Sequence, residues 1–191
     1  MTRRNQPSGA PAETGTGDPE ARARQICLQL LTIAPRTRAQ LATALSRRGV
    51  PPEAAEAVLA RFTDVGLIDD AAFARAWVES RHNSRGLSRR SLSAELRRQG
   101  VPAEEIREAV GTLDPGQEAA TARRLVERKM AGTRGQPAEV RVRRAAGTLA
   151  RKGYPPGLVF RLIKEVLEQE GAAEALDLDP DQYLDPDDPG E

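Results

Sequence analysis

The residues best suited to chemistry are two adjacent acids, Asp69 and Asp70, in the stretch GLIDDAAFARAWVESR (Gly66–Arg81). A pair of carboxylates can work as general acid and base or bind a metal ion. Alternatively, the pair begins a helix, because a carboxylate there accepts backbone N–H bonds and opposes the helix dipole. Adjacent carboxylates diverge at a helix start, and no His or Cys cluster accompanies them. We therefore favour the helix start.

Two aromatic residues follow the acids at a spacing of four. Phe73 and Trp77 would share one face of the predicted helix. We expect both to pack between structural repeats, with Trp77 largely buried.

Other reactive residue types are scarce. His82 is the only histidine, and it lies among polar neighbours near a predicted helix end, where a surface position is expected. Cys27, the only cysteine, lies in the apolar segment ICLQLL, so a packed thiol is favoured over a nucleophile, and no intramolecular disulfide is possible. The chain has no Walker loop, GxGxxG, HExxH or CxxC motif. We predict that it is not an enzyme and needs no cofactor or metal.

The composition favours helices. Apolar residues make up 39% of the 191 residues and aromatic residues only 3%, so a core must use Leu, Val, Ile and Ala. Ala, Arg, Glu and Leu are abundant, whereas Val and Ile rarely cluster. We find no signal peptide or long apolar run and expect a soluble, cytoplasmic protein without membrane contact.

An internal repeat determines the predicted architecture. Three segments align without a gap: LATALSRRGVPPEAAEAVLARF, LSAELRRQGVPAEEIREAVGTL and AAGTLARKGYPPGLVFRLIKEV. In each segment a leucine stands four residues before a glycine, and a proline stands two residues after it. The glycines are Gly49, Gly100 and Gly153.

This pattern predicts a helix, a tight turn and a second helix. The glycine can adopt a positive φ and close the first helix, and the proline leads into the next. A further helical segment precedes each pair, over about Glu20–Ala34, Asp70–Asn83 and Gln117–Ala131. Each repeat therefore has three helices.

The predicted fold is all-α, with three tandem helix-turn-helix-like repeats forming an elongated, curved array, and we expect a monomer. The expected divisions are a disordered extension over residues 1–19, repeats over 20–69, 70–114 and 115–170, and a disordered acidic tail over 171–191.

The net charge of +1 conceals an asymmetry. Between residues 21 and 168 there are 27 bases and 16 acids, whereas residues 169–191 carry 9 acids and no base. A basic body indicates a polyanionic or acidic partner, for which the tail can compete. A solvated surface with a solubilising tail is the alternative, and Tyr183 in the tail is expected to be solvated.

Two sets of basic residues recur between repeats. Pairs just before the three glycines lie in a last helical turn, where the helix dipole favours them. The second set lies near predicted helix starts, where the dipole opposes bases, so stability does not explain it. We interpret this set as a contact for DNA or an acidic protein surface. It comprises Arg85, Arg89, Arg90, Arg141, Arg143 and Arg144.

The stretch GLIDDAAFARAWVESR, followed by RGLSRRSLSAELRRQGV, closely resembles the signature of the RecX family of recombination regulators. The resemblance covers about residues 21–167. The matching positions are Gly66, Leu67, Ile68, Asp69, Asp70, Phe73, Ala74, Trp77, Arg81, Gly86, Leu92, Leu96 and Gly100. The N-terminal extension and the acidic tail lie outside it.

The resemblance implies a protein of DNA repair, homologous recombination and the SOS response. It implies binding in the groove of the RecA nucleoprotein filament, with inhibition of recombinase and ATPase activity. Direct binding of single- or double-stranded DNA is also implied for the family. It supplies no catalytic residues.

Two alternatives remain from the residues themselves. One is a sequence-specific helix-turn-helix protein that reads guanine edges with Arg89 and Arg90. The other is a helical adaptor without any link to nucleic acid.

Overall fold

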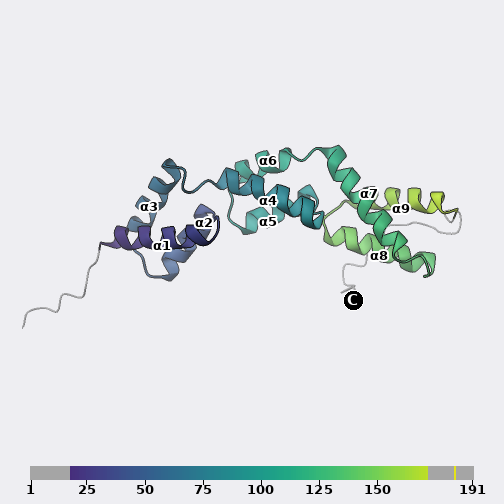
Figure 1. Ribbon diagram of the computed structural model, residues 1–191, viewed down its shortest axis with the longest axis horizontal. Helices are drawn as coiled ribbons and strands as arrows, with labels where there is room; N and C mark the ends of the chain where they lie inside the picture. Colours follow the sequence, from purple (N-terminus) through teal and green to yellow (C-terminus); the bar gives the residue numbers. More distant parts are fainter. Residues whose placement is uncertain (1–17, 172–182, 184–191) are drawn as a thin grey trace, which may run out of the picture. The chain divides into compact units, whose positions relative to one another are not determined.

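The computed structural model describes residues 18–171 and Tyr183, and within this part the chain is all-helical, as predicted. Figure 1 follows the helices from the purple N-terminal to the yellow C-terminal end. They are α1 (Pro19–Ile33), α2 (Arg38–Arg47), α3 (Pro52–Asp64), α4 (Asp70–Arg85), α5 (Arg89–Arg98), α6 (Ala103–Gly111), α7 (Pro115–Ala131), α8 (Ala138–Arg151) and α9 (Pro156–Gln169).

The repeated glycine closes α2, α5 and α8 in the same way. Gly49, Gly100 and Gly153 have φ values of 68°, 78° and 81°. In the third repeat the Gly153 amide donates to Ala150 O at 2.8 Å, and the Tyr154 amide donates to Leu149 O at 3.1 Å. These two bonds form a Schellman motif, which satisfies carbonyls at the end of the helix. Equivalent bonds close α2 and α5, which confirms the predicted turn.

Short polar side chains begin several of the helices. Asp69 Oδ1 accepts from the Ala72 amide at 2.7 Å, so the predicted N-cap is confirmed. Thr37 and Gln40 form a capping box at α2, and Ser88 caps α5. The prolines of the repeat occupy the N-cap position before α3, α6 and α9.

The chain divides into two compact units, Met1–Ile68 and Asp69–Glu191. The first contains α1, α2 and α3 around one core, in which Leu41, Leu45 and Leu59 are almost fully buried. The second contains two cores, because α4, α5 and α6 pack together and α7, α8 and α9 pack together. The second and third groups of helices thus lie in one compact unit.

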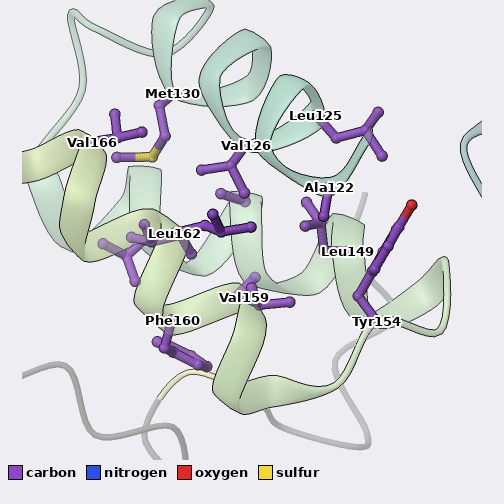
Figure 2. Packing of buried hydrophobic residues seen from close by; sticks show 14 of the residues in the cluster. Ala122, Leu125, Val126, Met130, Leu149, Tyr154, Val159, Phe160, Leu162 and Val166 are labelled. Atoms are coloured by element: carbon purple, nitrogen blue, oxygen red, sulfur yellow. The ribbon is translucent and has the colours of Figure 1, made fainter. Parts of the chain in front are cut away.

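Leu, Val, Ile and Ala supply most of the core that α7, α8 and α9 share, and Phe160 and Tyr154 widen it (Figure 2). Tyr183 joins this core, with its ring centroid 6.0 Å from that of Phe160. Its expected solvation was therefore wrong, since an aromatic ring gains from burial against apolar neighbours. The expected disorder of the N-terminal extension and tail otherwise concerns residues outside the described ones.

In the part of the chain that the structure describes, no helix combines the length and apolar character that crossing a bilayer requires.

Candidate functional site

The second and third groups of helices meet at a polar junction, where the end of α4 lies against α7 and the turn after α8. The Ser88 amide donates to Lys152 O at 3.0 Å, and Tyr154 Oη donates to Gly86 O at 3.0 Å. Gly86 ends α4 with φ at 62°, and a Cβ there would lie 3.0 Å from Leu125 Cδ1. A side chain at this position would therefore require Leu125 to shift, and the positive φ would add backbone strain.

His82 lies within this junction and is only 7% exposed, so the expected surface position was wrong. Its Nδ1 lies 2.9 Å from Leu87 O and its Nε2 lies 3.0 Å from Thr121 Oγ1. A carbonyl only accepts, so Nδ1 carries the proton, and in the neutral ring Nε2 accepts from the threonine hydroxyl. Both ring nitrogens are satisfied, and the imidazole links α4 to α7.

A cleft of about 980 Å³ opens beside the junction, between the end of α4, α7 and the end of α8. Five cationic side chains line it, and none of the described residues in its walls is Asp or Glu. The cations are Arg85, Arg124, Arg128, Arg151 and Lys152.

Lys152 shows the electrostatic consequence of this arrangement. Burial, together with the positive charges of Arg128 and Arg85, holds the pKa of Lys152 below its ordinary value. Its Nζ donates to Arg85 O at the C-terminal end of α4. The ammonium therefore caps a helix end but has no acidic partner lining the cleft.

The arginines that the sequence predicts as a contact do not all lie at helix starts. Arg89 and Arg90 do begin α5, where Arg89 is half-buried and Arg90 is exposed. Arg85 instead ends α4, so the helix dipole favours it. Arg143 and Arg144 are exposed in the middle of α8, so the argument from an opposing dipole was wrong for them.

Arg141 is a structural residue. It is 6% exposed, and its guanidinium bonds Glu170 Oε2 at 2.7 Å and Met130 O at 3.2 Å. The sequence pattern gave no sign that Glu170, beyond the last helix, would be its partner. The buried position removes Arg141 from any surface contact, which corrects the expectation.

The aromatic pair of α4 is half-buried against the core of the second group. Phe73 and Trp77 stack with centroids 5.6 Å apart, Trp77 Nε1 donates to Glu95 Oε2 at 2.9 Å, and Arg81 lies 4.4 Å above the indole. Trp77 was expected to be largely buried between repeats, whereas it is half-buried and packs against the core of its own group of helices. A polar edge and a cation over the ring keep one side of the indole near solvent.

The two acids that first indicated chemistry begin α4 and do not form a cluster. Asp70 is the first residue of this helix. Among the described residues, His, Cys, Asp and Glu nowhere gather in a group of three or more that could hold a metal ion. Cys27 is fully buried in the first core, and burial raises the pKa of its thiol, while Arg48 lowers it by a smaller amount.

The three groups of helices correspond to three domains of one family. Family models match residues 23–62 as the first three-helix domain of RecX, residues 69–110 as the second and residues 117–163 as the third. The chain belongs to the RecX family.

Close relatives carry the same name. The chain is 61% identical to "Regulatory protein RecX" from Thermobifida fusca, over 82% of this chain and 86% of that protein. It is 58% identical to the protein of the same name from Streptomyces coelicolor, over 81% and 82% of the two chains.

Solved RecX structures share the fold. A crystal structure of regulatory protein RecX aligns with a TM-score of 0.69 and 26% identity, over 78% of this chain and 74% of that one. RecX from Lactobacillus salivarius aligns with a TM-score of 0.70 over 78% and 97% of the chains, and at 16% identity it supports the fold alone.

The cleft of this RecX-family chain was missed from the sequence. Arg151 and Lys152 form one of the basic pairs that the helix dipole explains, and Arg124 and Arg128 belong to neither recurring set of bases. A spacing of four on α7 was the available signal, since it places both arginines on one helix face. Which face meets α4 depends on tertiary packing.

Proposed function

We propose that this protein regulates DNA repair and homologous recombination by binding the RecA–DNA filament in its groove and lowering RecA's recombinase and ATPase activity. The observation that carries the proposal is the family match across all three groups of helices, together with 61% identity to a regulatory protein RecX. The resemblance of the GLIDD stretch to the family signature supplies RecA as the partner, in the cytoplasm.

Exposed arginines support an acidic or phosphate-bearing partner. Arg90, Arg143 and Arg144 are exposed, and Arg89 is half-buried at the start of α5. None of the four forms a carboxylate ion pair within the described residues. Charges of this kind contribute to association rate and orientation when they meet an opposite potential.

The test is a titration of RecA's DNA-dependent ATPase with the wild type and with Arg89→Ala/Arg90→Ala/Arg144→Ala. We expect the wild type to inhibit, and the triple variant to require at least about tenfold more protein, equivalent to about 1.4 kcal/mol of binding free energy. Circular dichroism checks that the variant keeps its helices.

A matched control removes the same charge elsewhere. Arg97, Arg98 and Arg161 are exposed in the second unit, and their replacement by Ala should leave inhibition near the wild-type level. Inhibition by the first triple variant at the wild-type concentration would exclude those arginines as the contact. If the wild type leaves the ATPase unchanged, the helical-adaptor alternative replaces the proposal.

A further inference from the structure

The acidic segment that follows α9, residues 172–191, has one residue in the core of the third group of helices (α7, α8 and α9), and this residue is Tyr183. We propose that Tyr183 pins the acidic segment onto this group, and that the pinned charge lowers the affinity of the protein for its acidic partner. The pin stands on the contacts of Tyr183, whereas its regulatory effect on RecA rests on the function proposed above.

The point at which the acidic segment leaves α9 is fixed. Gly171 has a φ of 70°, and its amide donates to Glu168 O at 3.1 Å, which closes the helix. Beside it, Glu170 Oε2 accepts from the guanidinium of Arg141 at 2.7 Å, and Arg141 is 6% exposed. Removing one partner of a buried charge pair is strongly destabilising. The end of α9 is therefore held firmly against α8.

Tyr183 lies back along α9 rather than beyond its end. Its ring centroid is 6.0 Å from that of Phe160, and the two planes are tilted by 46°. Phe160 lies near the start of α9, and Gly171 follows it by eleven residues, which is about 17 Å along a helix. The twelve-residue step from Gly171 to Tyr183 can span about 40 Å, so the chain is long enough for this return.

The composition of the acidic segment makes Tyr183 its anchor. Residues 172–191 contain eight acids, three prolines and no base, and Tyr183 is their one aromatic residue. A chain of this kind buries too little apolar surface to fold by itself, whereas an aromatic ring gains from burial against apolar neighbours. One ring acting against the entropy of loop closure gives a reversible closure, which a regulatory contact requires.

Pinning Tyr183 concentrates negative charge on the third group. Asp181 and Asp185 are each two residues from Tyr183, so their Cα atoms lie within about 7 Å of its Cα. On α8, Arg143 and Arg144 are exposed and form no carboxylate ion pair within the described residues. A three-helix group is about 20 Å across, which is two to three Debye lengths at physiological salt. The tethered carboxylates therefore reduce the positive potential that these arginines offer to a partner.

The first measurement tests the pin without RecA. The chain has two tyrosines, Tyr154 and Tyr183, so full-length protein labelled with fluorotyrosine gives two fluorine resonances, which Tyr183→Phe assigns. A soluble paramagnetic chelate should relax the Tyr183 resonance little more than that of Tyr154, which is 3% exposed. Relaxation of Tyr183 at the rate seen in urea would overturn the pin.

The second measurement tests the shielding with a probe that is neither RecA nor a nucleic acid. Immobilised heparin is a polyanion, and the salt concentration that elutes the protein reports its positive potential. Tyr183→Ala should elute at higher salt than the wild type although its net charge is unchanged, because release of the acidic segment uncovers the bases. Tyr183→Phe keeps the ring and should elute with the wild type. Identical elution of all three proteins would overturn the shielding.

Two neutralised variants separate the pinned charge from charge in general. Asp181→Asn/Asp185→Asn removes two carboxylates beside the pin and should elute at higher salt, with Tyr183 still protected from the chelate. Glu79→Gln/Glu108→Gln removes two exposed carboxylates of α4 and α6 and should shift the elution less. Equal shifts would mean that net charge alone determines retention, which would overturn the local effect of the pin.

The third measurement joins the pin to the proposed function. In the titration of RecA's DNA-dependent ATPase, Tyr183→Ala should reach half-inhibition at about threefold less protein or lower, since removing a competing closed state raises the binding-competent fraction. The gain should shrink as the salt concentration rises. A heparin shift with an unchanged ATPase titration would refute the regulatory role. If the wild type itself leaves the ATPase unchanged, the proposed function fails, and the fluorine and heparin results alone decide the pin and its shielding.

Discussion

The two compact units use similar three-helix groups but present different surfaces. Of the described residues, the large hydrophobic side chains that remain exposed all lie in the first unit, and Ile33 is the most accessible at 77%. The others are Leu28, Val65 and Leu67. In the second unit comparable side chains are covered, and the prominent surface feature is the cationic cleft.

The difference shows that repetition of helices does not repeat the surface. The first unit has a basic cleft of its own, lined by Arg36, Arg47 and Arg48, but it is smaller, at about 400 Å³. The larger cleft exists because two groups of helices meet, so cations from both line one space. The positive potential of the larger cleft therefore depends on the junction, whereas exposed apolar side chains of the first unit are better suited to a protein partner.

The sharpest test of this comparison makes the same substitution at two equivalent glycines, one in each unit. Gly49 and Gly153 close α2 and α8 with similar positive φ. A Cβ on Gly153 would lie 2.2 Å from Ser91 Oγ and 2.6 Å from Ser88 Oγ, whereas a Cβ on Gly49 would meet nothing within 4 Å. Gly153→Ala should cost about 3 kcal/mol or more, combining backbone strain and overlap, and Gly49→Ala only about 1 kcal/mol.

Urea unfolding followed by circular dichroism measures both free energies of unfolding. Equal losses of stability would mean that the turn after α8 does not press against α5 as the structure places it.

These glycines also mark what the sequence could predict. Local chemistry determined the turns, since a leucine, a glycine and a proline at fixed spacing close one helix and begin another. The close approach of Gly153 to Ser91 involves residues far apart in the chain, and no spacing predicts it. His82 was misplaced for the same reason, because its burial depends on Thr121 of α7.

The next largest effect concerns Tyr154 at the junction. Burial, with a smaller contribution from Glu118, raises the pKa of its hydroxyl from 10.0 to about 12. Because the folded-state pKa lies above the unfolded value, the stabilisation is complete below pH 10 and is lost as the pH rises toward 12. The wild type should lose about 2–3 kcal/mol more than Tyr154→Phe over this range, since one pKa unit corresponds to about 1.36 kcal/mol.

The free energy of unfolding of both proteins is measured at several alkaline pH values. The comparison with Tyr154→Phe removes the contribution of other titrating groups, because both proteins share them. Parallel curves would show that the Tyr154 hydroxyl ionises as readily in the folded protein as in the unfolded chain.

The smallest effect expected is a difference in stability between the two units. Each contains a natural probe, because the chain has one cysteine, Cys27, in the first unit and one tryptophan, Trp77, in the second. Cys27 is fully buried, so a thiol reagent reaches it only when the first core opens.

The first unit has one small core and exposed apolar side chains, whereas the second joins two cores. Since smaller units bury a smaller fraction of their surface, the first should be less stable by about 1–2 kcal/mol. Thiol labelling in increasing urea should therefore precede the change in Trp77 fluorescence. Coincident transitions would instead mean that the two units unfold as one.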